Sequence, residues 1–189
     1  MILEYPKFIY PHYQLYPRLG DMDFESMTCI DFGCGDYHSD VAKQVLEIPF
    51  KQLTSVEGYE KDFNNIPPVK AKEHIKIKEF IPTLLPTLKG KYDLALAFDV
   101  IEHLEKEEGE KLLNWIDKHC KQALLFVPDE PEGFHRICND ENVLQNHISY
   151  WREEDFTKRG YKVERIKNGH AEQMGDKYFY YDALWAVKL

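Results

Sequence analysis

The feature that most constrains this chain is a short apolar segment that runs directly into a turn with two glycines. Residues Thr28–Phe32 are predicted to form a buried β-strand, and Gly33, Cys34 and Gly35 follow it without a spacer. Glycine accepts positive φ and lets a ligand lie against the bare backbone. In an open α/β sheet, ligands bind beyond the carboxyl ends of the strands, so this turn is a candidate nucleoside site. A turn needed only to leave the strand is the alternative.

The segments after this turn predict an α/β fold. Short apolar runs alternate with amphipathic or polar stretches, which is the pattern of βαβ units that build a mainly parallel sheet. Five runs are predicted as strands: Thr28–Phe32, Thr54–Tyr59, Ile75–Phe80, Leu94–Phe98 and Ala123–Val127.

Helices and a final hairpin complete the prediction. The sequence predicts helices at Ser39–Leu46, Glu107–Lys118 and Glu153–Lys158. Tyr161–Ile166 and Tyr178–Val187 are predicted as two strands that pair as a hairpin across the Gly-containing stretch 168–177.

The 189 residues fit one domain. Residues 1–27 are predicted to form an irregular N-terminal arm, because Pro6, Pro11 and Pro17 restrain their neighbours away from helix. Residues 28–189 are predicted to form the globular domain. Within it, the polar segment Pro128–Tyr150 is predicted as a long loop placed to cover a substrate.

Charge and composition exclude several classes of partner. With 33 acidic and 24 basic residues the net charge is −9, which argues against a nucleic-acid partner. No apolar run approaches the roughly 20 residues of a membrane span and no signal peptide opens the chain, so we expect a cytoplasmic protein that does not bind membranes. The four cysteines lack paired spacing and are predicted to be reduced, and the eight histidines are scattered, so no metal is predicted.

An acid after the second predicted strand supports a nucleoside site. A carboxylate at this place can accept both hydroxyls of a ribose. Glu60 is the preferred candidate, because it follows Gly58 and Tyr59, where the strand is predicted to end. Glu57 is the competing candidate, which would point sideways from within the strand.

Two kinds of cofactor compete for the glycine turn. A dinucleotide site requires the pattern G-x-G-x-x-G, but His38 stands at the third glycine. Asp36 would also repel a pyrophosphate, whereas the sulfonium and ammonium groups of S-adenosylmethionine (SAM) are cationic and tolerate nearby acids. The local charges therefore favour SAM.

With these residues in view, the sequence resembles the class I SAM-dependent methyltransferases, in particular the small-molecule branch with an E-H-L motif after the fourth strand. Residues 30–35, Ile-Asp-Phe-Gly-Cys-Gly, resemble the first motif D-x-G-x-G, and residues 58–60, Gly-Tyr-Glu, are similar to the G-x-D/E end of strand two. Residues 92–104 carry the most specific match, an FDLV-like strand followed by a V-x-E-H-L helix start.

The resemblance covers about Thr28 to Leu189, since residues 124–128 and 147–163 are also similar to the family's later segments. It implies a single-domain, Rossmann-like three-layer sandwich. Its sheet would have seven strands, mostly parallel, with the last strand antiparallel.

The resemblance also implies roles for individual residues, with SAM as the cofactor. Asp31, Gly33, Cys34 and Gly35 would line its methionine and ribose, Glu60 would hold the ribose diol, Glu79 would accept from the adenine amino group beside Phe80, and Asp99 would face the methyl group. The sequence departs from the family pattern at two places. Tyr37 replaces the third glycine of D-x-G-x-G-x-G, so either the loop runs differently or Tyr37 packs over the cofactor, and His119-Cys120-Lys121 replaces a P-G-G turn.

The implied reaction is methyl transfer to a small-molecule acceptor such as a metabolite, a sugar or a lipid head group. A sulfonium is already an activated leaving group, so the protein mainly aligns donor and acceptor. An oxygen or nitrogen acceptor would also need a base, for which His103, Asp99 and His135 are the candidates, although His103 could instead bond backbone.

Two other classes remain open. One is a binding or scaffold protein that keeps the fold without the chemistry. The other is a NAD-type oxidoreductase, against which the missing third glycine and the missing Tyr-x-x-x-Lys argue.

Overall fold

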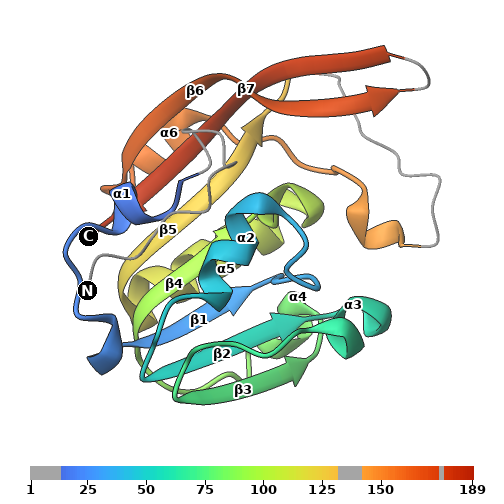
Figure 1. Ribbon diagram of the computed structural model, residues 1–189. Coiled ribbons are helices and arrows are strands. Elements are labelled where there is room, and N and C mark those ends of the chain that lie inside the picture. The colour runs from blue at the N-terminus through green and yellow to red at the C-terminus, as the bar shows by residue number, and fades with distance from the viewer. Residues whose placement is uncertain (1–13, 132–141, 175–176) are drawn as a thin grey trace.

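The computed structural model describes residues 14–131, 142–174 and 177–189. Its centre is one sheet of seven strands in the order β3-β2-β1-β4-β5-β7-β6, with helices on both faces (Figure 1). The strands are β1 (Thr28–Phe32), β2 (Gln52–Glu57), β3 (Glu73–Lys78), β4 (Tyr92–Phe98), β5 (Cys120–Asp129), β6 (Lys162–Met174) and β7 (Lys177–Lys188).

The strand directions confirm the predicted sheet. Strands β1 to β5 pair in parallel, whereas β7 pairs antiparallel with both β5 and β6. The helices are α1 (Tyr16–Leu19), α2 (Asp40–Leu46), α3 (Glu60–Asn65), α4 (Ile81–Leu84), α5 (Lys106–His119) and α6 (Glu153–Thr157), with the 3-10 helices η2 (Phe24–Ser26), η3 (Ile101–His103) and η4 (Val143–Gln145).

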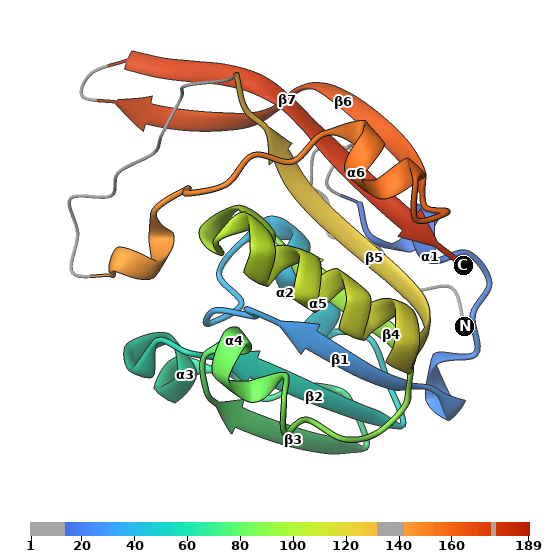
Figure 2. The ribbon, with the colours of Figure 1, turned by 180° about the vertical axis from the view of Figure 1, so that it is seen from behind.

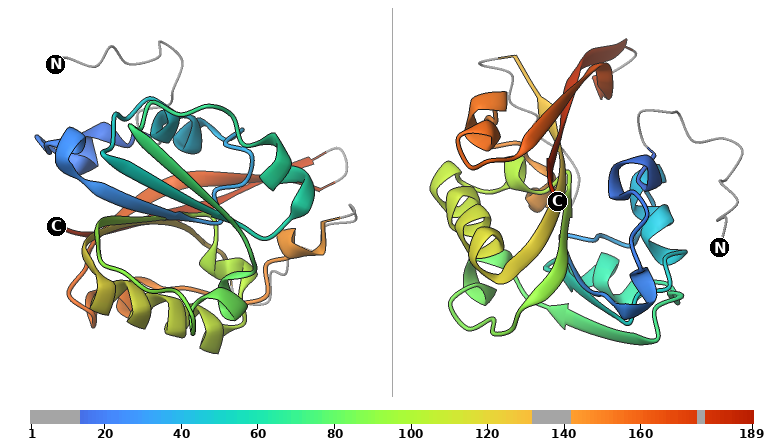
Figure 3. Two further views of the ribbon diagram at one scale, coloured as in Figure 1. Left: turned by 90° about the horizontal axis from the view of Figure 1, so that it is seen from below. Right: turned by 90° about the vertical axis from the view of Figure 1, so that its left-hand side faces the viewer.

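The alternation of side chains along each strand feeds two hydrophobic layers. Ala95, Ala97 and Leu125 face the layer that α4, α5 and α6 cover, as seen from behind in Figure 2. Leu96 and Leu124 face the opposite layer, which α1 and α2 cover. The edge-on view in Figure 3 shows the sheet between these two groups of helices. The result is the three-layer sandwich that the sequence predicts.

The N-terminal segment is part of this packing. Leu15, Leu19 and Phe24 are buried in the same layer as Val41 and Val45 of α2. The main-chain N–H of Leu15 also donates to the side-chain oxygen of Gln44 at 3.0 Å.

Two predicted strand ends are wrong by two residues. Strand β2 ends at Glu57 rather than at Tyr59, because Gly58 and Tyr59 form the turn into α3, whose first residue is Glu60. Strand β3 ends at Lys78, two residues before the predicted end, and Phe80 already precedes α4.

The final hairpin is longer than predicted. The stretch 168–177 was expected to be the connection, but β6 continues through it to Met174. The register shifts between Ile166 and His170, and Asn168 there has φ of 51°. The N–H of Asn168 donates to the carboxylate of Asp182 at 3.0 Å, so a β-bulge absorbs the irregular residues and the hairpin extends past the end of β5.

The prediction of one long polar loop over Pro128–Tyr150 is wrong in part. Strand β5 continues to Asp129, and Glu130 and His147 are each only 3% exposed. The polar composition predicts a loop that covers a substrate, but the side chains of Glu130 and His147 pair with one another and pack inward. None of the helices in the described ranges is long and apolar enough to cross a lipid bilayer.

Candidate cofactor and acceptor site

The glycine turn after β1 lies close against the segment after β4. Gly33 has φ of +62°, and a Cβ on it would lie 2.7 Å from Cγ2 of Val100. The N–H of Cys34 donates to the carbonyl of Val56 at 3.1 Å, which ties the turn to β2. The turn therefore needs glycine for its backbone conformation and for its close approach to Val100.

Glu57, at the end of β2, fixes the other side of the turn. Its carboxylate accepts from the N–H of Gly35 at 2.8 Å and from the N–H of Tyr59 at 2.7 Å. Burial raises the pKa of Glu57, and these backbone donors partly oppose the rise. The sequence predicts a carboxylate at the end of the second strand, and in the structure Glu57 is the last residue of that strand.

Tyr37 occupies the position of the third glycine of the motif. It keeps a left-handed backbone, with φ of 60°, and its ring is 2% exposed within the layer beneath α2. Its hydroxyl shares a 2.7 Å hydrogen bond with Oγ of Ser55. The ring therefore packs into the hydrophobic core.

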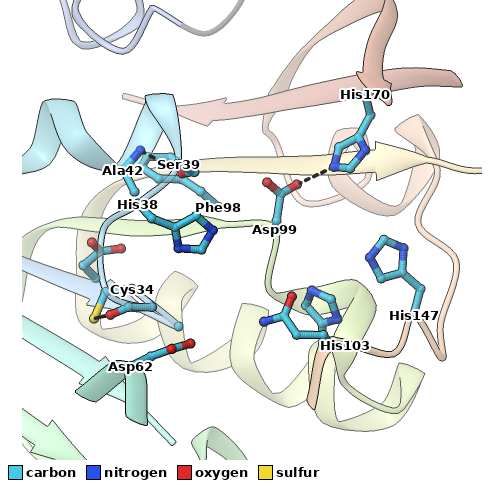
Figure 4. A pocket seen from close by; sticks show the side chains of 14 residues that line it. Cys34, His38, Ser39, Ala42, Asp62, Phe98, Asp99, His103, His147 and His170 are labelled. Atoms are coloured by element: carbon cyan, nitrogen blue, oxygen red, sulfur yellow. Dashed lines mark hydrogen bonds and ion pairs between the residues drawn. The ribbon is translucent and has the colours of Figure 1, made fainter. Parts of the chain in front are cut away.

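Two cavities meet at the carboxyl ends of β1 and β4. The polar cavity, of about 220 Å³, is lined by Asp31, Gly35, Asp62, Asp99, His147 and His170 among others (Figure 4). The apolar cavity, of about 390 Å³, is lined by Glu57, Phe80, Ile81, Val100, Leu104 and Ile148 among others. Gly33, Asp99, His103 and Gln145 line both.

Asp31 is the most strongly perturbed acid that lines a cavity. It is 2% exposed, and burial raises its pKa to about 7, against a hydrogen bond from Tyr37 that lowers it. Among the described residues, its Oδ2 atom has no hydrogen-bond partner. A buried carboxylate oxygen of this kind suits a cationic ligand group such as an ammonium.

Asp99 directly follows β4 and faces His170, a histidine that the sequence did not predict for the site. Asp99 has φ of 52°, and its Oδ1 atom lies 3.4 Å from Nε2 of His170 (Figure 4). The His170 ring stacks on Tyr181 with centroids 5.0 Å apart, which holds it over the cavity from β6. No local motif marks His170, since only the extended hairpin brings it to the end of β4.

Among the residues that the structure describes, most of the sequence-predicted ones line the two cavities, but Glu60 and Glu79 line neither. Asp31, Gly33, Cys34, Gly35, Phe80, Asp99 and His103 line one or both cavities. The preference for Glu60 rested on a strand that ends directly before it, but β2 ends three residues earlier, at Glu57. Glu60 begins α3 with its side chain 73% exposed and pairs with Lys78 at 3.2 Å. The carboxylate of Glu79 accepts the N–H of Phe80 at 3.0 Å, and its contact with adenine stays a prediction. His135 lies outside the described residues.

Cys34 and His103 have specific surroundings. Burial raises the pKa of the Cys34 thiol far above its ordinary range, so this cysteine is a neutral thiol. Nδ1 of His103 lies 3.1 Å from the carbonyl oxygen of Asn146. His103 therefore bonds the backbone, which was the alternative to a catalytic role. The carbonyl that it bonds lies far from it in the sequence.

Residues 9–166 match the sequence profile of a methyltransferase domain family. The match spans most of the chain, which therefore belongs to this family and, with the sheet described above, to the class I SAM-dependent methyltransferases. The cofactor of the class is SAM.

Solved structures share the fold at low sequence identity. The methyltransferase domain of a bacterial Hen1 is 18% identical with a TM-score of 0.54, over 86% of this chain and 90% of that one. Magnesium protoporphyrin IX methyltransferase from Synechocystis, solved with SAM, is 16% identical with a TM-score of 0.53, over 88% and 72%. A DhpI complex with SAM is 8% identical with a TM-score of 0.59, over 86% and 78%. A search of curated protein sequences gives no match.

Proposed function

We propose that this chain transfers the methyl group of SAM to a small-molecule acceptor. The observation that carries this proposal is the junction of the two cavities at Gly33, Asp99 and His103. One cavity is apolar and suits a nucleoside, the other is polar and suits charged groups. A methyl donor bound across the junction would present its reactive carbon where the two meet.

The apolar cavity suits the adenosine of SAM. Phe80, 47% exposed, offers a ring face at one wall, and Ile81 and Val100 offer apolar surface for a base. Glu57 supplies a carboxylate at the end of β2, and we propose it in place of Glu60 as the partner of the ribose hydroxyls.

The polar cavity suits the cationic part of SAM. Asp31, Asp62 and Asp99 contribute three carboxylates to its wall. When bound, SAM supplies a methyl group on a sulfonium that needs no further activation. Asp31 would accept from the ammonium, while the remaining wall holds the acceptor against the methyl group.

The pair of Asp99 and His170 is the best-placed base. Asp99 can hold the imidazole in one tautomer and stabilise its protonated form, as carboxylates do for catalytic histidines. His170 would then take the proton of an oxygen or nitrogen acceptor. His103 faces the same junction of the two cavities.

The wall charges support a small-molecule acceptor over a nucleic acid. Structural neighbours include Hen1, a small RNA methyltransferase, and magnesium protoporphyrin IX methyltransferase, so fold does not choose between acceptors. Three aspartates around the polar cavity would repel phosphates, and the chain has a net charge of −9. These charges favour a small, uncharged or cationic acceptor.

A calorimetric titration with S-adenosylhomocysteine (SAH), SAM and NAD tests the proposal. We expect SAH and SAM to bind and NAD not to bind. Glu57→Gln should weaken SAH binding by about 10- to 100-fold, the scale of a lost charge-assisted hydrogen bond. Glu60→Gln is the matched control, since its exposed carboxylate pairs with Lys78, and it should change the affinity less than about twofold.

The outcomes separate the alternatives. No binding of either sulfur nucleoside would contradict the cofactor site, and NAD binding would favour an oxidoreductase. If SAM binds but neither small acceptors nor short RNA lead to SAH release, the result would favour a binding or scaffold protein. SAH release with RNA alone would overturn the small-molecule acceptor.

A further inference from the structure

Two histidines and two glutamates converge beside the polar cavity. Glu102 and His103 belong to η3, Glu130 follows β5, and His147 precedes the segment that leads to α6. One carboxylate oxygen of Glu102 and one ring nitrogen each of His103 and His147 all lie within 4.8 Å of one another. Glu102 is 1% exposed and His147 is 3% exposed.

A hydrogen bond to the backbone orients the ring of His103. Its Nδ1 atom faces the carbonyl oxygen of Asn146, and a carbonyl only accepts, so Nδ1 carries a proton. In the neutral ring, Nε2 is then an acceptor, and it lies 3.8 Å from Oε1 of Glu102. A cation bound between these two atoms would be attracted to both. A proton could serve for this pair alone, whereas a metal ion would also engage His147.

His147 is oriented in the same way. Its Nδ1 atom bonds the carboxylate of Glu130, which is 3% exposed, and this leaves Nε2 as the nitrogen able to bind a ligand. A metal-binding histidine commonly donates its other N–H to a carboxylate or a backbone carbonyl, and both histidines here have such a partner.

The backbone holds the cluster in place across a long sequence separation. The carbonyl of Glu102 accepts from the N–H groups of Ile148 at 2.8 Å and Ser149 at 3.1 Å. Oγ of Ser149 and Nε1 of Trp151 both donate to the carbonyl of Ile101, at 3.0 and 3.1 Å. His147 is thus fastened beside η3 by bonds on its C-terminal side.

We propose that Glu102, His103 and His147 bind a divalent first-row transition ion such as Zn²⁺, Mn²⁺ or Co²⁺, with Glu130 orienting His147. Two imidazoles and one carboxylate suit these ions, whereas Mg²⁺ and Ca²⁺ prefer oxygen ligands. Metal–ligand bonds of about 2.1 Å place neighbouring ligand atoms roughly 3.0–3.5 Å apart, so small side-chain rotations close the set. The sequence predicts no metal because these ligands come from segments with no motif spacing.

The site has a consequence for the acceptor, which rests on the proposed function. Three protein ligands leave coordination positions open, and His103 and His147 both line the polar cavity (Figure 4). An oxygen of the acceptor could occupy an open position, where the ion would lower the pKa of a hydroxyl. Acceptors with an oxygen that can bind a metal are then favoured.

Metal binding is measured without SAM or acceptor, so its failure is distinguishable from failure of the proposed function. The probe is Co²⁺, titrated into the untagged full chain after treatment with a chelator, and followed by visible absorption and calorimetry. We expect one Co²⁺ per chain. Glu130→Gln should weaken binding by about 10- to 100-fold, and His147→Gln should weaken it further. His119→Gln is the matched control, because His119 bonds Trp115 at the far end of α5 and should leave the affinity unchanged.

A second measurement needs no substitution. Both Nδ1 protons are hydrogen-bonded, so the proton spectrum of the wild-type Co²⁺ complex should show two paramagnetically shifted imidazole N–H signals. Fewer than two signals, no Co²⁺ binding, or equal affinity in His147→Gln and His119→Gln would each overturn the site. Thermal unfolding of each variant verifies that a lost affinity reflects a lost ligand.

Discussion

The two sides of the site are built in different ways. On the cofactor side, Asp31, Gly33, Gly35 and Glu57 belong to one β-α-β unit, from β1 to β2. On the side proposed for the acceptor, the residues come from three segments: the stretch after β4 (Asp99 and His103), the stretch before α6 (His147) and β6 (His170). The first side is set by local backbone conformation, the second by packing between distant parts of the chain.

The difference teaches where the chain is sensitive. A local backbone feature fails when a single φ angle or close approach is denied. A site assembled over long distances depends on the core residues that hold its segments together.

The largest effect is expected at Trp151, which fastens the acceptor side. Its ring is fully buried against Gly109 of α5, and its N–H donates to Ile101. Trp151→Ala should reduce the free energy of unfolding by about 3–5 kcal/mol, as for other large core truncations. Urea unfolding measures this change, and hydrogen exchange should show loss of protection at residues 147–149 before loss in β1 and β2.

Trp151→Phe is the matched control, because it keeps a ring in the core and removes the N–H. It should cost about 0.5–1.5 kcal/mol. Equal loss of protection on both sides of the site would contradict the view that Trp151 acts mainly on the acceptor side.

The next effect is expected at Gly33, on the cofactor side. Gly33→Ala places a Cβ in a left-handed conformation and 2.7 Å from Val100, so we expect a loss of about 2–3 kcal/mol in stability. Gly20→Ala is the control, because Gly20 has φ of +64° with nothing within 4 Å of its added Cβ, and it should cost about 1–2 kcal/mol. Urea unfolding of both variants isolates the contact with Val100, and equal costs would show that the close approach contributes nothing.

The smallest effect is the pH dependence of SAH binding through Asp31. With a pKa raised to about 7, Asp31 is mostly protonated at pH 6 and mostly ionised at pH 8. If the carboxylate accepts from the ligand ammonium only when ionised, the affinity of the wild type relative to Asp31→Asn should rise by about tenfold over this interval, as the ionised fraction does. The ratio removes the titration of the ligand itself. A flat ratio would place the ammonium elsewhere.

Ionisation of Asp31 has the opposite effect on stability to its effect on SAH binding. The folded-state pKa of Asp31 lies above its unfolded value, so its ionisation opposes folding, and the free energy of unfolding falls as pH rises from about 4 to 7. Asp31→Asn should flatten this part of the profile, measured by urea unfolding at each pH.

The same contrast explains what could be predicted from the sequence. The sheet and the turn at Gly33 follow from local patterns, because strand periodicity and glycine spacing are properties of neighbouring residues. The predicted end of β2 at Tyr59, on which the preference for Glu60 rested, is wrong because Tyr59 extends an apolar run that the backbone leaves at Gly58. His170 could not be predicted, since its position depends on the bulge that lengthens the hairpin.

Tyr37 restricts the loop after Gly35 before any ligand binds. At a position where the family has glycine, the left-handed conformation is held by a buried ring and by its bond to Ser55 instead of by the freedom of the residue. A glycine would leave the free loop more conformations to lose when a ligand binds. A loop that Tyr37 already holds has fewer conformations to lose, so part of the entropic cost of ligand binding is met during folding rather than at each encounter with a cofactor.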